Sequence, residues 1–166
     1  MEPNLIITYD PSHPGKAEKE VGALLHAHKF EITDSSNPGL FLVHLSHAKE
    51  AVKSLRRLPE DSFEVTFKWI PIETWTRSDD LDIDKILVDY NERIGEEESW
   101  KLALGFRMYK KHGKSELTRL LTRNINRKNV DLKNPDKIVV VEIIGGQAGL
   151  SLLDKSEYLD TQKMQS

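Results

Sequence analysis

The first half of the chain alternates short apolar runs with segments of helical periodicity. The pattern predicts, in chain order, a strand over 4–9, a helix over 11–28, strands over 30–35 and 39–46, a helix over 47–58 and a strand over 62–70. In the first helix, apolar residues recur at helical spacing, namely Ala17, Val21, Leu24 and Leu25, and "SNPG" between the two middle strands is a turn signal. The order β-α-β-β-α-β predicts a ferredoxin-like unit, an antiparallel sheet with two helices on one face.

The second half has a different order of elements. We expect a helix over 80–94, a strand over 99–109, a helix over 114–128 and a final apolar hairpin over 138–153. The segment "PIETWTRSDD" contains a proline and changes period, so we interpret it as a connection. The sequence therefore predicts an α+β protein with an N-terminal ferredoxin-like domain (1–78), a second α/β domain (79–154) and a polar tail with little to bury (155–166).

Composition narrows the class of protein. The chain has 166 residues, 38% of them apolar, which allows one ordinary domain or two small ones. No run of about 18 apolar residues occurs, and the first residues lack the pattern of a signal peptide, so we expect a cytoplasmic protein without a membrane span. The absence of cysteine excludes thiol nucleophiles, iron–sulfur clusters and cysteine-ligated zinc.

The net charge of −3 hides a strong local asymmetry. Residues 106–137 carry ten lysines and arginines against three acidic residues, a net charge of +7. Because a partner responds to the local field, this segment predicts a polyanionic ligand even though the whole chain is slightly acidic.

The cations of this segment follow a pattern. Arg119, Arg123 and Arg127 repeat every four residues, so they would form a row on one face of the helix over 114–128, with few acidic neighbours within that helix. Lys110, Lys111 and Lys114 surround a glycine just before the helix, where ammonium groups and free backbone N–H groups suit phosphate oxygens. The alternative interpretation is a solvated surface that only keeps the protein soluble.

The sequence "VDLKNPD", followed by an apolar strand and "EIIGGQAGLSLL", resembles the THUMP domain, a module of tRNA-modifying proteins. The order of elements over 80–153 and the preceding ferredoxin-like unit also agree with this family. The resemblance implies binding of the tRNA acceptor stem and its 3′ CCA end. Carried over to this sequence, it implies a set of RNA-binding residues: Arg107, Lys110, Lys111, Lys114, Arg119, Arg123 and Lys133. Arg127 joins this predicted set because it continues the row of arginines.

The resemblance also implies a role. Family members join the RNA-binding part to catalytic domains, whereas this sequence contains neither "GxxxxGK[ST]" nor "GxGxxG". It looks like the stand-alone adaptor that helps an RNA acetyltransferase make N4-acetylcytidine in tRNA, which implies no catalysis, no cofactor and no metal in this chain. The alternatives are an RNA-binding subunit of a split tRNA thiolation or methylation enzyme, and a protein-interaction domain that does not bind RNA.

Other polar residues favour structural roles. Asp131, Asn134 and Pro135 are expected to fix the chain as it enters the strand, while Lys133 is a candidate RNA contact. His26 and His28 lie two apart on a predicted helix and would point to different faces, which argues against a metal site.

Overall fold

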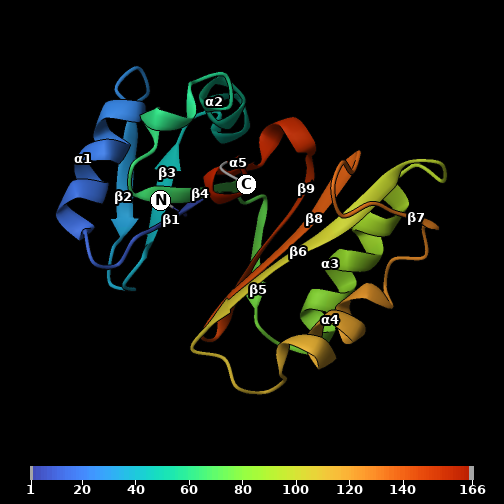
Figure 1. Ribbon diagram of the computed structural model, residues 1–166. Helices are drawn as coiled ribbons and strands as arrows, with labels where there is room; N and C mark the ends of the chain where they lie inside the picture. The colour runs from blue at the N-terminus through green and yellow to red at the C-terminus, as the bar shows by residue number, and fades with distance from the viewer. Residues whose placement is uncertain (1, 165–166) are drawn as a thin grey trace. The chain divides into compact units, whose positions relative to one another are not determined.

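The computed structural model describes residues 2–164, and they form two compact units. The first unit is the chain up to Ile72 together with the residues from Ser156, and the second is Glu73–Lys155. The α+β class predicted from the sequence is confirmed, since helices and strands are mixed and each unit has a separate sheet (Figure 1). The division differs from the predicted one, because residues 73–78 and the end of the chain each belong to a sheet that the sequence pattern did not assign to them.

The first unit follows the predicted β-α-β-β-α-β order. Its elements are β1 (Leu5–Tyr9), α1 (Pro14–Leu24), β2 (Phe30–Asp34), β3 (Leu40–Leu45), α2 (Ala48–Leu55), the 3-10 turn η1 (Glu60–Ser62) and β4 (Thr66–Pro71). The strand order is β10-β4-β1-β3-β2, and every pairing is antiparallel. This topology is compatible with a ferredoxin-like unit.

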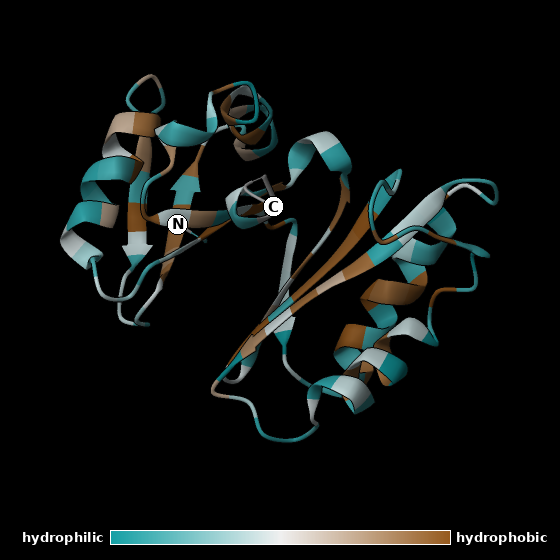
Figure 2. Cartoon of the chain, viewed as in Figure 1, coloured by the Kyte–Doolittle hydropathy of each residue, from teal (hydrophilic) through white to brown (hydrophobic). Residues whose placement is uncertain are grey.

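The core of the first unit lies between the sheet and its two helices. Ala17 and Val21 of α1 are buried there with Trp69 of β4, and the rings of Tyr9 and Phe41 stack with centroids 4.3 Å apart. Figure 2 shows the apolar strands as brown segments and the outer helix faces in teal.

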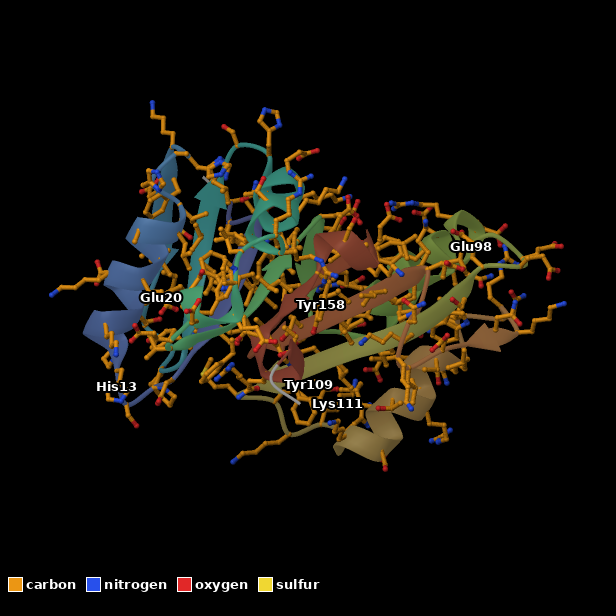
Figure 3. The ribbon with its side chains drawn as sticks, turned by 45° about the horizontal axis from the view of Figure 1, so that its top comes forward. His13, Glu20, Glu98, Tyr109, Lys111 and Tyr158 are labelled. Atoms are coloured by element: carbon orange, nitrogen blue, oxygen red, sulfur yellow. The ribbon has the colours of Figure 1, made fainter. Side chains whose placement is uncertain are left out.

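A carboxylate on α1 binds backbone amides at the start of β4. Glu20, labelled in Figure 3, accepts hydrogen bonds from the backbone N–H groups of Glu64 (2.7 Å) and Thr66 (2.8 Å). Glu64 lies in the loop before β4 and Thr66 is the first residue of that strand, so the side chain supplies acceptors for backbone amides at the point where the loop becomes a strand.

The end of the chain adds a strand to the first sheet. After the 3-10 turn η2 (Lys155–Glu157), β10 (Leu159–Asp160) pairs with the otherwise open edge of β4, and the short helix α5 (Thr161–Met164) follows. Tyr158 and Leu159 are buried, and the Thr161 hydroxyl donates to the Thr66 carbonyl at 2.9 Å. The segment predicted to be a polar tail with little to bury is thus packed in the first unit. Its two apolar side chains are buried, and its backbone pairs with the edge of β4.

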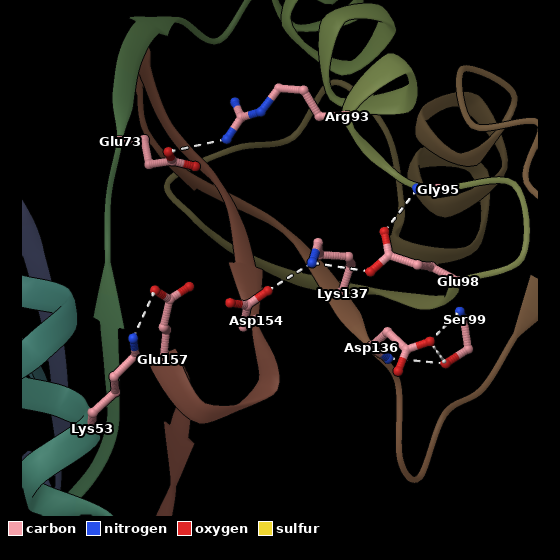
Figure 4. Close-up of polar contacts among 10 residues, drawn as sticks. All are labelled: Lys53, Glu73, Arg93, Gly95, Glu98, Ser99, Asp136, Lys137, Asp154 and Glu157. Atoms are coloured by element: carbon pink, nitrogen blue, oxygen red, sulfur yellow. Dashed lines mark hydrogen bonds and ion pairs between the residues drawn. The ribbon is translucent and has the colours of Figure 1, made fainter.

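Further contacts hold η2 in the first unit. The Lys53 ammonium of α2 lies 3.7 Å from the Glu157 carboxylate (Figure 4), and the Arg56 guanidinium donates to the Tyr158 carbonyl at 2.7 Å.

The second unit contains a sheet with two helices on one face (Figure 1). Its elements are β5 (Thr74–Arg77), α3 (Asp80–Arg93), β6 (Ser99–Arg107), α4 (Lys114–Thr122), β7 (Asn129–Val130), β8 (Lys137–Ile144) and β9 (Gln147–Asp154). The strand order is β5-β9-β8-β6-β7; β6 is parallel to β7 and β8, whereas β8 and β9 form the predicted antiparallel hairpin.

The side chains of β8 alternate between the two faces of this sheet. Val139, Val141 and Ile143 pack in the core that α3 and α4 cover. Glu142 lies on the opposite face, opposite Gly105 of β6, and a Cβ at Gly105 would overlap its carboxylate. Glycine at position 105 therefore leaves the space that the buried Glu142 side chain occupies.

A group of ion pairs joins the first residues of β8 to the rest of the unit (Figure 4). The Lys137 ammonium lies 2.7 Å from Asp154 of β9 and 3.1 Å from Glu98, and Glu98 also accepts the Gly95 amide at 2.7 Å. The hydrogen bond to Asp154 is the main cause of the raised pKa of Lys137, which burial opposes. The Lys137 ammonium is therefore paired with two carboxylates of the second unit.

Among the described residues, no helix is both long enough and apolar enough to span a membrane.

Candidate nucleic-acid interface

The basic loop, residues 107–114, is fixed at both ends by backbone hydrogen bonds. At its start, the Gly145 amide in the β8–β9 turn donates to the Arg107 carbonyl at 2.9 Å. At its end, Gly113 caps α4, and its carbonyl accepts the Leu117 amide at 2.9 Å. Figure 3 labels Tyr109 and Lys111 on this loop. The loop is thus tied to the sheet on one side and to the helix on the other.

His112 links the basic loop to both helices of the second unit. Its Nε2 atom lies 3.1 Å from Asp80 Oδ2 at the start of α3, and its Nδ1 atom lies 3.0 Å from Glu116 Oε1 in the first turn of α4. The ring thus bridges one carboxylate on each of the two helices. The sequence pattern indicates no role for His112.

Asp80 also binds Lys111, whose ammonium lies 3.2 Å from the same Oδ2 atom. Burial favours the protonated form of Asp80, but the hydrogen bonds from His112 and Lys111 outweigh it and hold the pKa of this carboxyl below its usual value. The hydrogen bond between Lys111 and Asp80 also raises the pKa of the Lys111 ammonium. Lys111, predicted to contact RNA, is therefore paired with a carboxylate of α3.

An aromatic contact holds the middle of the loop. The Tyr109 ring packs edge-on against Phe106, with centroids 6.0 Å apart, and lies 6.5 Å from the His112 ring. Its hydroxyl is buried and has no hydrogen-bond partner in the described part of the chain, and burial raises the pKa of this tyrosine. Because Tyr109 points inward, its neighbours Met108 and Lys110 are left exposed.

The predicted helical row of three arginines does not form. Helix α4 ends at Thr122, whose hydroxyl donates back to the Thr118 carbonyl at 2.7 Å, so Arg123 is the C-cap and Arg127 lies beyond the helix. The Arg127 Nε atom donates to the Ile94 carbonyl at 2.6 Å, which gives this half-buried side chain a structural contact.

Arg123 is paired across the two helices. Its Nη2 atom lies 3.2 Å from Asp84 Oδ2 on α3. The other carboxylate oxygen of Asp84 accepts a hydrogen bond from the side-chain amide of Asn124 at 2.7 Å. Few acidic residues lie near these arginines within the basic helix itself. The carboxylates that pair with its cations come from the other helix.

In the basic loop and α4, three predicted cations remain exposed without a side-chain partner among residues 2–164. They are Lys110 and Lys114 of the basic loop and Arg119 of α4. Lys110 and Lys114 belong to the anchored segment, and Arg119 follows in the next turn of the helix. The structure therefore brings together part of the predicted set, with Arg107 at the start of the same loop and half-buried.

Side chains of residues 131–135 stabilise the turn that precedes β8. Asp131 accepts the amides of Lys133 (3.0 Å) and Asn134 (2.9 Å), and these two backbone hydrogen bonds lower the pKa of Asp131. Asn134 accepts the Lys155 ammonium at 2.7 Å, and Pro135 is buried. Lys133 is exposed on this turn, away in sequence from the basic loop.

The described residues contain no group of three or more His, Cys, Asp or Glu side chains placed to hold a metal ion. His26, one of the two histidines on the predicted first helix, contacts the Ala23 carbonyl through Nδ1 at 2.8 Å.

A comparison with protein families identifies the second unit. Residues 107–153 match the family model described as "THUMP domain". The chain contains a THUMP domain. The match begins at the first residue of the basic loop and runs through α4, β7 and β8 into β9. The resemblance carried by "VDLKNPD" and the final hairpin is confirmed, and the exposed cations Lys110, Lys114 and Arg119 all lie inside the matched segment.

Solved structures share the fold of this chain over most of its length. PH1313 from Pyrococcus horikoshii is 18% identical, with a TM-score of 0.65, over 95% of this chain and 55% of that one. TrmN from Thermus thermophilus is 18% identical, with a TM-score of 0.59, over 89% and 44%. A possible methylase from Clostridium difficile is 8% identical, with a TM-score of 0.60, over 92% and 41%. The chain thus spans about half, or less, of the length of these proteins.

A comparison with curated proteins gave no match.

Proposed function

We propose that the THUMP domain binds RNA through the basic loop and the first turns of α4. The observation that carries this proposal is a pair of exposed lysines, Lys110 and Lys114, which have no side-chain partner among the described residues and lie on a loop held in place by Gly145, Asp80 and Glu116. Cations on a fixed backbone lose little conformational freedom when they bind phosphates, so they suit a rigid polyanion better than mobile surface lysines do.

The RNA we propose is tRNA, gripped at the acceptor stem and the 3′ end. The THUMP match supports this choice, because the resemblance from the sequence implies that site. Recognition of a helical stem through its backbone, together with an unpaired end, also fits a surface with few cations and no helix-turn-helix.

In this proposal the chain presents tRNA to a separate enzyme, most specifically an RNA acetyltransferase that forms N4-acetylcytidine, and performs no chemistry itself. Binding both the RNA and the enzyme would raise the effective concentration of one near the other. The sequence motifs support this role, since neither a P-loop nor a dinucleotide-binding motif occurs in the printed chain.

A second candidate is the RNA-binding subunit of a split tRNA methylation or thiolation enzyme. The observation in its favour is the fold shared with a possible methylase from Clostridium difficile, of which this chain matches 41%. A third candidate is a protein-interaction domain whose basic surface binds an acidic protein.

Filter binding separates RNA binding from protein binding. Intact tRNA, tRNA without its 3′ CCA, and duplex DNA of similar length would be titrated with the protein over a series of salt concentrations. We expect intact tRNA to bind best, with a log–log salt slope of roughly −2 to −4 for three to five phosphate contacts. Equal retention of the duplex DNA would contradict tRNA recognition.

The reaction served by the protein is tested in cells. Mass spectrometry of tRNA nucleosides from a deletion strain should show loss of N4-acetylcytidine. Unchanged N4-acetylcytidine with loss of a methylated or thiolated nucleoside would support the second candidate.

A further inference from the structure

Met108 is an exposed apolar residue with an unusual backbone conformation. Its φ angle is 53°, and it is one of two non-glycine residues with positive φ in the described chain. Its side chain is 68% exposed. Both features are unfavourable for an isolated methionine, because the left-handed region crowds Cβ and the exposed thioether remains in water.

The exposure of Met108 is imposed by its neighbours. On one side, Arg107 accepts the Gly145 amide, and on the other side Tyr109 packs inward against Phe106. The Met108 Cε atom lies 3.9 Å from the position that a Cβ on Gly145 would occupy, so the side chain lies along the glycine turn. Gly145 itself has φ 59°. The thioether is thus presented at a fixed place, beside a turn that carries no side chain.

The residues around Met108 define what this apolar surface can bind. Lys110 follows two residues later and is exposed without a side-chain partner in the described chain, and Lys114 closes the same loop. An apolar, polarisable side chain on the same short loop as two exposed lysines matches a group with a flat apolar face and an attached phosphate. An unstacked nucleobase in single-stranded RNA has this chemistry.

We propose that Met108 is the contact for an unpaired nucleobase, which packs on the thioether and the glycine turn while Lys110 and Lys114 hold the adjoining phosphates. This inference rests on the proposed function, since it assigns the base-contacting residue of the same surface. It separates the two parts of the interface: the lysines supply affinity for any phosphate backbone, and Met108 supplies the preference for a strand with an exposed base.

The test compares two RNAs that differ only at one end: a short stem with a single-stranded 3′ extension, and the same stem with a blunt end. The variants are Met108→Ala, Met108→Gly and Met108→Leu, and Val88→Ala is the matched control, because Val88 is an exposed apolar residue on α3, 52% exposed. Met108→Gly removes the side chain and relieves the positive φ, so its thermal stability should equal or exceed that of the wild type.

We expect Met108→Ala and Met108→Gly to weaken binding of the extended RNA by about two- to tenfold, the range of a sulfur–aromatic contact, and to leave binding of the blunt stem unchanged. Met108→Leu should keep most of the preference, and Val88→Ala all of it. If the wild type prefers the extended RNA and Met108→Gly keeps that preference, the inference is wrong and the proposed function stands. If the wild type binds neither RNA, both fail.

Discussion

The guanidinium of Arg123, at the end of α4, lies 3.2 Å from the carboxylate of Asp84 on α3. Lys111 and Asp80 form the same kind of pair, 3.2 Å apart, nearer the start of both helices. Helix α3 therefore neutralises some of the cations that the sequence pattern assigns to RNA. Among the described residues, the cations that remain available to a ligand are those that do not pair with a carboxylate of α3.

This division predicts unequal effects of removing cations. The triple variant Lys110→Ala, Lys114→Ala and Arg119→Ala should weaken tRNA binding tenfold or more and make the salt slope less steep by roughly 2 to 3, because three phosphate contacts are lost. Arg123→Ala should weaken binding less than each of the single variants Lys110→Ala, Lys114→Ala and Arg119→Ala, and should leave the salt slope nearly unchanged, since its charge is already partly neutralised. Salt titrations by filter binding, with thermal melts as folding controls, measure both. Equal effects of Arg123→Ala and of any single lysine variant would contradict the division.

Removing the negative charge that pairs with Arg123 should raise tRNA affinity instead of lowering it. Asp84→Asn keeps an oxygen that can accept the Asn124 amide but removes the negative charge near Arg123. We expect tRNA affinity to rise about two- to fivefold, the scale of an exposed ion pair. Glu92→Gln on the exposed side of α3 is the control, because it changes net charge equally and has no ion pair in the described chain. A rise in both variants would indicate an effect of net charge alone.

Asp80 should make stability depend on pH in the acidic range. Its pKa in the folded protein is lower than the ordinary value of 3.8, so its ionised form stabilises the fold above about pH 4, and this contribution is lost as the pH falls through the folded pKa. The side chain is partly exposed, so we expect less than about 1 kcal/mol. Urea unfolding of the wild type and Asp80→Asn between pH 7 and pH 3 should show the difference shrinking toward low pH. A difference that stays constant over this range would contradict the assignment.

The last residues of the chain should contribute to the stability of the first unit. Leu159 in β10 is 1% exposed, and Leu159→Ala removes buried methyl groups, at a cost of about 2 to 5 kcal/mol. Gln162→Ala, three residues later and exposed, should change the free energy of unfolding by less than about 0.5 kcal/mol. Chemical denaturation of the two variants measures this contrast, and similar stabilities would show that β10 does not pack as described.

Local periodicity in the sequence determined most of the elements. The helical spacing of apolar residues predicted α1, α2 and α3, and the apolar run with its two glycines predicted the β8–β9 hairpin. These predictions depend only on which side chains share a face within one segment. The family resemblance was carried by the same hairpin and its lead-in, and the THUMP match over residues 107–153 confirms it.

Tertiary structure decided which predicted cations are exposed and unpaired. Asp84 and Arg123 lie 39 positions apart in sequence, so no pattern within the basic helix could indicate their pairing. The same reason applies at the edges of the sheets. Segments as short as β5 and β10 carry little periodic signal, and each becomes a strand because a longer strand, β9 or β4, offers it unpaired backbone groups. The sequence alone thus determined the presence of a basic surface, whereas the contacts between α3, the basic loop and α4 determined which residues form it.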